Sequence, residues 1–321
     1  MFGDLHNHTT SSDGEYTPVE LVDAAQSKGI RVLGISDHDT VNGLRAAHDH
    51  ALKTRAVEHF VPGVEVSLRF KRDFFVGTLH YLVYMPPAFL DNAAFIDEFN
   101  AVLSQARGEE LTRARVRALN AYIGPDSANE DGKKSAAFPE ISHHPSIFLE
   151  TPFSEDEIAR VLPPGNTNAT RRHFALALQA RGLTKDEVNE CVGNSSPAYL
   201  PSGLPMEALA PFLQKYPSLV KVLAHPAAGS YPGKSHYREV LPPVETVERL
   251  LPEIAGTVGI DGFEVYYPGH TEELRNRVLG WMKEGSFLAT GGSDCHDRVD
   301  RPLGVAGIDE TLTHTFLSRL K

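Results

Sequence analysis

The sequence predicts an α/β barrel of seven strands that is interrupted by a mostly helical insertion. Runs rich in β-branched residues alternate with helical patterns near both ends of the 321-residue chain, which is typical of a largely parallel sheet. A histidine or an acidic residue stands in, or soon after, each of the seven predicted strands. Active sites of parallel barrels lie at the carboxyl ends of the strands, so one pattern favours both a barrel and a metal site.

Length and composition limit the class of protein. The chain can bury a large core, either as one barrel-sized domain or as a domain with a sizeable insert. A formal net charge of −11 argues against a broad basic surface for duplex DNA. The two cysteines lie far apart, no apolar run reaches the roughly 18 residues of a membrane helix, and no signal peptide is expected before His6. We therefore expect a cytoplasmic protein without disulfides or membrane contact.

The first predicted strand, residues 2–5, leads into a histidine pair. Side chains two residues apart on a strand face the same side, so His6 and His8 can bind one ion. Asp13 follows in a Ser/Gly loop, from which its carboxylate can turn toward the same point. Such a histidine pair is weak evidence for metal binding by itself. It becomes stronger if the other predicted strands also carry possible ligands.

The next elements alternate between helix and strand. Thr17 and Glu20 form a capping box around Pro18, which predicts a helix that stops at Gly29. A second helix is predicted over residues 41–57. Three strands are predicted in this part of the chain, over residues 30–35 before His38, 60–66 with Glu65, and 74–84 with His80.

The alternation stops between residues 93 and 213. We interpret this stretch as a helical insertion that caps the active site, and we assign residues 1–92 and 214–321 to the barrel. One long helix is predicted over 93–123, followed by a polar loop over 124–134. Shorter helices are predicted over 172–180 and after the capping box of Thr184 and Glu187.

The alternating pattern returns after the insertion. Helices are predicted over residues 244–254 and 272–283. The last three strands are predicted over 219–224 before His225, 262–266 with Glu264, and 287–290 before Asp294 and His296.

Five motifs together resemble the PHP (polymerase and histidinol phosphatase) family. They span almost the whole chain in the family's order. The resemblance implies a distorted seven-stranded (β/α) barrel, a trinuclear metal centre and hydrolysis of phosphoesters by attack of a metal-bridging hydroxide. The motifs are His6-Asn7-His8 with Asp13, Ser36-Asp37-His38-Asp39-Thr40, Gly63-Val64-Glu65, Ala224-His225-Pro226 and Ser293-Asp294-Cys295-His296.

Within the family, the chain is most similar to the branch that hydrolyses nucleoside 3′,5′-bisphosphates and trims short oligonucleotides from the 5′ end. Residues 170–175, 197–201 and 262–267 carry this likeness. Ser195-Ser196 stands where the branch has a basic residue, and the stretch 143–146 is longer than usual. A histidinol-phosphate-type or cyclic-phosphate phosphoesterase is the alternative. A metal-binding module without catalysis is a remote one, because no ligand position is missing.

The resemblance implies nine metal ligands and a partition among three ions. His6, His8, Glu65 and Asp294 would hold one ion, with Glu65 bridging to a second held by His80 and His225. Asp13, His38 and His296 would hold the third. Imidazole and carboxylate suit Mn²⁺, Fe²⁺ or Zn²⁺. Glu65, Asp294 and His225 are the expected catalytic residues, acting with the metal-bound hydroxide.

Four residues are predicted to bind substrate. Arg171 and His173 are the candidates for binding phosphate, since guanidinium binds phosphate bidentately. The alternative is that both lie on an ordinary solvated helix face. The sequence does not distinguish Arg171 from Arg172 as the residue that contacts phosphate. Glu264 can bind substrate or instead orient a metal ligand. His270 can bind substrate or simply begin a helix.

Several other residues have a structural alternative that competes with a role in the site. Asp37 is expected to orient an imidazole rather than bind metal. Cys295 is expected to be a small buried residue. His143 and His144 precede a proline and most often form a turn, and Tyr199 can either stack on a base or pack.

Overall fold

The computed structural model describes residues 2–125, 138, 140–164, 166, 168–283 and 285–320. The chain divides into two compact units, one formed by Met1–Ala106 with Gly203–Lys321 and the other by Arg107–Ser202. These boundaries fall inside the predicted insertion of residues 93–213. Most of the polar loop predicted over 124–134 lies outside the described residues. No described helix combines the length and the apolar character needed to cross a membrane.

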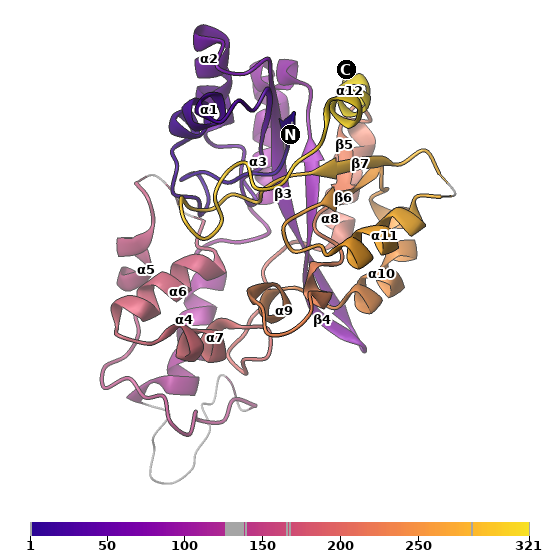
Figure 1. Cartoon of the computed structure of the whole chain (residues 1–321). Helices are drawn as coiled ribbons and strands as arrows, with labels where there is room; N and C mark the ends of the chain where they lie inside the picture. The colour runs from indigo at the N-terminus through magenta and orange to yellow at the C-terminus, as the bar shows by residue number, and fades with distance from the viewer. Residues whose placement is uncertain are drawn as a thin grey trace. The chain divides into compact units, whose positions relative to one another are not determined.

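The first unit contains one seven-stranded sheet whose strands follow one another in chain order (Figure 1). All neighbouring pairs are parallel except those that β4 makes with β3 and β5. The sheet curls until its ends meet, because Leu5 N donates to Gly291 O at 3.1 Å and Asn7 pairs with Cys295. The seven-stranded, nearly closed barrel is therefore confirmed. Its strands are β1 (Gly3–Asp4), β2 (Val32–Ile35), β3 (His59–Arg72), β4 (Phe75–Tyr84), β5 (Val220–Leu223), β6 (Gly262–Tyr266) and β7 (Leu288–Gly291).

The distortion of the barrel comes from the β3–β4 hairpin. β3 runs to Arg72, six residues beyond its predicted end, and only Asp73 and Phe74 separate it from β4. A connection this short forces an antiparallel pair, since parallel neighbours need a crossover of a dozen or more residues. In this pair Ser67 lies opposite His80.

Helices of the first unit cover the sheet. The capping box of Thr17 and Glu20 begins the first of them, as predicted. Pro211 lies inside α8, and a proline within a helix argues against predicting one there. The helices are α1 (Pro18–Ser27), α2 (Leu44–Thr54), α3 (Ala93–Leu103), α8 (Met206–Lys215), α9 (His236–Val240), α10 (Val244–Thr257), α11 (Glu272–Trp281) and α12 (Glu310–Arg319), with 3₁₀ turns at Pro87–Asp91 and Ala228–Ser230.

Aromatic packing holds α3 and α8 in the first unit. The rings of Phe99 and Phe212 stack with centroids 4.5 Å apart, and Phe95 lies 5.4 Å from Phe212. These side chains belong to the same buried cluster as the strands β3 and β4. Both helices are therefore part of the barrel unit, although the sequence analysis assigned them to the insertion.

The second unit is a group of helices with its own core. Its helices are α4 (Glu109–Ile123), α5 (Glu155–Val161), α6 (Arg171–Ala180) and α7 (Lys185–Val192). Phe153, Ile158, Phe174 and Leu178 are among its fully buried side chains. The prediction of one helix over 93–123 is wrong, because α3 and α4 are separate. Gly108 stands between them with φ of 132°, a conformation that no helix contains.

Candidate metal centre

Residues in or just after the strands of the first unit converge at one end of the barrel. His6 and His8 follow β1, and His38 follows β2. Glu65 and His80 lie within the β3–β4 hairpin. The set is completed by residues of loops, namely Asp13 after β1, His225 after β5, and Asp294 and His296 after β7. Parallel strands with a common direction bring their carboxyl ends to one rim, which explains the convergence.

One group of possible metal ligands contains His6, His8, Glu65 and Asp294, all buried. His8 Nε2 lies 3.2 Å from Glu65 Oε2 and 3.0 Å from Asp294 Oδ1. His6 Nε2 lies 3.3 Å from Glu65 Oε1. These four residues are those that the sequence analysis assigned to one ion.

A second group surrounds the other side of Glu65. It contains His38, Glu65 and His80, with His38 Nδ1 3.0 Å from Glu65 Oε2 and His80 Nδ1 3.0 Å from Oε1. His225 Nε2 also lies 3.0 Å from Glu65 Oε1. Glu65 thus contacts His80 and His225, the two histidines expected to hold the second ion. It also contacts His38, which the predicted partition assigned to the third ion.

The third group contains Asp13, His38 and His296, with His8 added. His296 Nε2 lies 3.3 Å from Asp13 Oδ1, and His38 Nε2 lies 4.0 Å from the same oxygen. His8 and His38 therefore each take part in two groups. Shared ligands place the three groups next to one another, as neighbouring ions require.

The donor set fits divalent metal ions. Glu65 Oε2 and Asp294 Oδ1 are buried and receive no hydrogen bond of normal geometry, although imidazole nitrogens lie within about 3.2 Å of both. Ligand atoms bound to one ion at about 2.0–2.2 Å are separated by about 3–3.5 Å. Imidazoles and carboxylates that approach one another in this way, without hydrogen bonds between them, are arranged as ligands around a cation.

Electrostatics keep the three carboxylates ionised. Burial raises the pKa of a carboxyl, but the imidazoles around Asp13, Glu65 and Asp294 outweigh it and hold each pKa well below the ordinary value. Burial opposes the charged form of His8, yet Asp294 and Glu65 raise its pKa to about 9. For His296, burial and then the charge of Arg301 lower the pKa to about 3. Ionised carboxylates are the form that binds metal.

Backbone strain is concentrated at this centre. Three of the four described non-glycine residues with positive φ are Asp39 at 51°, His225 at 30° and Asp294 at 50°. Such conformations cost about 1–3 kcal/mol each and persist where the surrounding structure fixes them. Strain at two of the candidate ligands supports a functional origin.

Glu264 contacts two of the candidate ligands. Its oxygens lie 3.0 and 3.2 Å from His6 Nδ1, and Oε2 accepts a hydrogen bond from His225 N at 2.8 Å. Two roles were predicted for Glu264, namely binding substrate or orienting a metal ligand. These contacts correspond to the second role. His270 is similarly engaged, because its ring contacts Val265 O at 3.0 Å and Ala227 N at 3.1 Å. Both nitrogens of His270 are thus used by backbone groups.

Asp37 orients a loop rather than an imidazole. Its carboxylate accepts hydrogen bonds from Thr9 N and Thr9 Oγ1, each at 2.7 Å, and from Ser12 Oγ at 2.5 Å. The loop between His8 and Asp13 is held in place by these bonds. Cys295 is fully buried, and burial raises the pKa of its thiol to about 12, in agreement with the expected packing role.

Two further residues lie at the centre that were not predicted from the sequence. The Tyr267 hydroxyl donates to Asp294 Oδ2 at 2.8 Å, and Arg301 Nη1 lies 3.9 Å from the same oxygen. Tyr267 directly follows β6, so its position at a strand end was a usable signal. Arg301 stands in an irregular loop without a motif, and nothing in the sequence singled it out.

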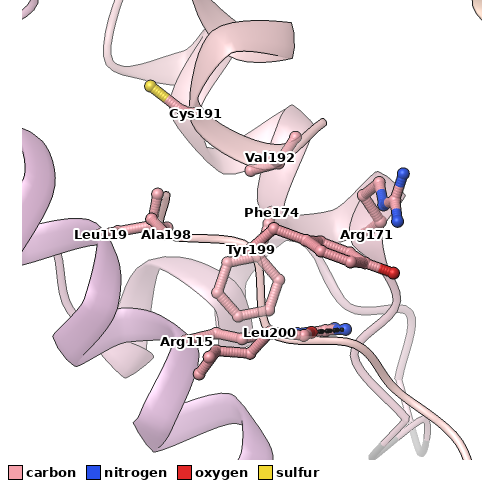
Figure 2. A pocket seen from close by; sticks show the side chains of 9 residues that line it. All are labelled: Arg115, Leu119, Arg171, Phe174, Cys191, Val192, Ala198, Tyr199 and Leu200. Carbon is pink, nitrogen blue, oxygen red and sulfur yellow. Dashed lines mark hydrogen bonds between the residues drawn. The ribbon is translucent and has the colours of Figure 1, made fainter. Parts of the chain in front are cut away.

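The second unit has a pocket of about 290 Å³, open mouth included, that holds Arg171 (Figure 2). The Arg171 guanidinium lies 4.6 Å from the centre of the Tyr199 ring and donates to Asn194 Oδ1 at 2.8 Å. Arg115 donates to Leu200 O at 2.7 and 3.0 Å. Burial lowers the pKa of Arg115 to about 9, and the charges of Arg107 and Arg171 add to this effect. The residues that line the pocket thus include two guanidinium groups and the Tyr199 ring, and none of them is a carboxylate.

The remaining candidates of the second unit have local contacts. His173 is buried and its Nδ1 accepts from Thr170 N at 3.0 Å, so it closes the capping box of α6. His143 contacts Tyr122 O at 3.0 Å, and His144 Nε2 lies 2.8 Å from Glu190 Oε2. Nδ1 of His144 accepts from Ile147 N at 2.9 Å, which is the contact of a turn.

Comparisons with known proteins agree with the family resemblance and the fold. Residues 4–137 match the PHP domain family, which confirms the predicted resemblance. A 5′-3′ exoribonuclease of Haemophilus influenzae is 26% identical over 304 residues, covering 91% of this chain and 89% of that protein. A 3′,5′-nucleoside bisphosphate phosphatase of Chromobacterium violaceum is 41% identical over 69 residues, 22% of this chain and 24% of that protein.

A solved structure has the same fold. It is that of a protein from Bifidobacterium adolescentis inferred to be a metal-dependent phosphoesterase. The TM-score is 0.69 at 24% identity, over 99% of this chain and 96% of that one. The two proteins therefore share their fold along nearly the whole length of both chains.

Proposed function

We propose that this chain, which carries a PHP domain, hydrolyses a phosphate monoester of a small nucleotide, such as a nucleoside 3′,5′-bisphosphate. The reaction class, hydrolysis of phosphoric esters, is that of the family match and of the relatives named above. The single observation that carries the proposal is that three groups of imidazoles and carboxylates share ligands, with Glu65 belonging to two of the groups. We assign three divalent ions to these groups, with Mn²⁺, Fe²⁺ or Zn²⁺ suited to the donors.

The protein's own residues hold the reacting groups in place. Divalent ions at this centre supply Lewis acidity toward phosphate and lower the pKa of water. Each oxygen of Glu65 contacts one imidazole of the first group and one of the second, so its carboxylate links the two groups. His225 and Asp294 complete the catalytic set. Asp294 is oriented by the Tyr267 hydroxyl and His225 by the carboxylate of Glu264.

The pocket of the second unit supports a nucleotide as the substrate class. Arg171 with Arg115 offers guanidinium groups for phosphate, and Tyr199 offers a ring on which a base can stack. The two relatives named as an exoribonuclease and a nucleoside bisphosphate phosphatase both act on nucleotide phosphoesters. Short oligonucleotides are therefore the second substrate to test.

The test measures phosphate release from adenosine 3′,5′-bisphosphate by protein reconstituted with Mn²⁺, Fe²⁺ or Zn²⁺. We expect turnover, with a higher kcat/KM than for histidinol phosphate. Glu65→Gln should lower kcat/KM by at least about 100-fold, because it removes the charge shared by two groups. Failure of all three metal-loaded forms to release phosphate from any of these esters would contradict the proposal.

A further inference from the structure

The loop after β7 brings a guanidinium group to the metal centre. Arg301 Nη1 lies 3.9 Å from Asp294 Oδ2, and the side chain is 24% exposed. This distance exceeds that of a hydrogen bond. Within the described part of the chain, no other carboxylate pairs with this guanidinium and no hydrogen bond engages it.

Both oxygens of Asp294 have partners other than Arg301. Its Oδ2 accepts the Tyr267 hydroxyl at 2.8 Å, and its Oδ1 faces His8 Nε2 at 3.0 Å and His296 Nδ1 at 3.3 Å. The carboxylate is therefore committed to the metal centre and its support. The donors of the guanidinium are available to another anion.

The backbone of Arg301 is held in place. Asp297 Oδ1 accepts hydrogen bonds from the backbone N–H groups of Asp300 at 2.6 Å and Arg301 at 3.0 Å. Arg301 O in turn accepts from His296 N at 3.0 Å, which joins the loop to a candidate ligand. The side chain therefore starts from a fixed point beside the centre.

Charge determines what this guanidinium can bind. It lies beside groups that fit cations, 3.9 Å from an oxygen of the candidate ligand Asp294. A cation kept near other cations is stabilised by an anion that lies between them. A phosphoryl group meets this requirement, because guanidinium can bind two of its oxygens at once.

We propose that Arg301 binds the non-bridging oxygens of the substrate's phosphoryl group at the metal centre. The inference rests on the proposed function and adds a residue to it. Arg301 contacts the reacting group directly and stabilises negative charge there. Its loss should weaken the binding of the phosphate product as well as turnover.

The first measurement is the Kd of inorganic phosphate for Mn²⁺-loaded protein, by isothermal titration calorimetry. Arg301→Ala should weaken phosphate binding by about 10-fold or more, and Arg301→Lys by less, because lysine keeps the charge but not the paired donors. Metal content, measured by mass spectrometry, should stay equal to that of the wild type. kcat/KM for adenosine 3′,5′-bisphosphate should fall in parallel.

The same loop provides the control. Arg298 lies three residues earlier, with its guanidinium 4.0 Å from the centre of the Tyr16 ring and 3.7 Å from Glu20 Oε2. Arg298→Ala removes an equal charge and should leave phosphate binding within about twofold of the wild type.

Three results would overturn the inference. They are wild-type protein that does not bind phosphate, an Arg301→Ala variant that binds it as tightly as Arg298→Ala, or loss of metal from Arg301→Ala. Inactivity of wild-type protein on every ester would instead contradict the proposed function, while the phosphate titration would still decide the role of Arg301.

Discussion

Glu264 shows how one side chain can position two others. The carboxylate is fully buried, contacts the His6 imidazole and accepts the backbone N–H of His225. A carboxylate on the far nitrogen of a metal-binding imidazole fixes its tautomer and makes it a better ligand. Because His225 has a strained φ of 30°, the second contact also stabilises a loop that would otherwise relax.

Glu264→Gln is therefore expected to weaken metal binding. The amide keeps the size of the side chain but loses the charge that His6 requires, so affinity should fall by about 10- to 100-fold. Competition with a chelator of known affinity measures the change. Glu273→Gln, an exposed change on α11, is the control, and equal affinities in the two variants would contradict the role assigned to Glu264.

At the scale of elements, the contact between β1 and β2 depends on a glycine. A Cβ built on Gly34 would lie 2.2 Å from Leu5 O, between the end of β1 and His6. Any side chain at this position must push the two strands apart. Asn7 Nδ2 also donates to Gly34 O at 3.1 Å, so the same spot anchors the residue between the two histidines.

Gly34→Ala should lower the free energy of unfolding by about 1–3 kcal/mol, as overpacked cores do. Metal affinity should fall with it, because Leu5 displaces His6. Gly280 on α11 has open space around it, and Gly280→Ala should stabilise the chain by up to about 1 kcal/mol. Urea unfolding measures the change in the free energy of unfolding for both variants. Equal changes would contradict the close approach of Gly34 to Leu5 O.

The helices of the second unit contain an ion pair whose contribution depends on pH. Arg181 donates to both oxygens of Glu157, and this contact lowers the pKa of Glu157 from 4.5 to about 2. A pKa lowered by folding means that the stabilisation is present above about pH 4.5. It is lost as the pH falls toward 2, when the carboxylate is protonated in both states.

Glu157→Gln should therefore destabilise α5 and α6 at pH 7 by an amount on the order of 2 kcal/mol. The difference from the wild type should shrink as the pH falls from 4.5 to 3. Hydrogen exchange of the amides in the two helices measures it, with Glu155→Gln as an exposed control on the same turn. A difference that stays constant with pH would contradict the ion pair as its cause.

Local patterns predicted most of these elements, and long-range contacts account for the exceptions. Capping boxes at Thr17 and Thr184 marked helix starts correctly, since capping is a local interaction. The extension of β3 to Arg72 depends on pairing with β4, which a single run of residues does not reveal. Arg301 reaches the centre through loop hydrogen bonds to Asp297, and such contacts leave no periodic signal.

At the scale of the whole molecule, the candidate ligands connect distant parts of the chain. The centre joins loops after β1, β2, β5 and β7 with the β3–β4 hairpin. Asp4 adds a further link, since its carboxylate accepts hydrogen bonds from Ser293 N at 2.9 Å and Asn7 Nδ2 at 2.9 Å. Bound metal should therefore stabilise the barrel as a whole.

Removal of metal with a chelator should lower the melting temperature, and Mn²⁺ or Zn²⁺ should restore it. A ligand present at about 100 times its Kd stabilises the native state by about 2.7 kcal/mol. Differential scanning calorimetry measures the shift. Glu65→Gln should respond much less, and a wild-type melting temperature unaffected by chelation would contradict metal binding at this centre.

The distribution of the ligands along the chain has a consequence for biosynthesis. His38, Glu65 and His80 are all made within the first quarter of the chain, whereas the other two groups need Asp294 or His296. At a synthesis rate of about 5–20 residues per second, the ribosome needs about 10–40 s to pass from His80 to His296. Of the three candidate ligand groups, the nascent chain can thus bring only one together early, and the other two must wait until translation is nearly finished.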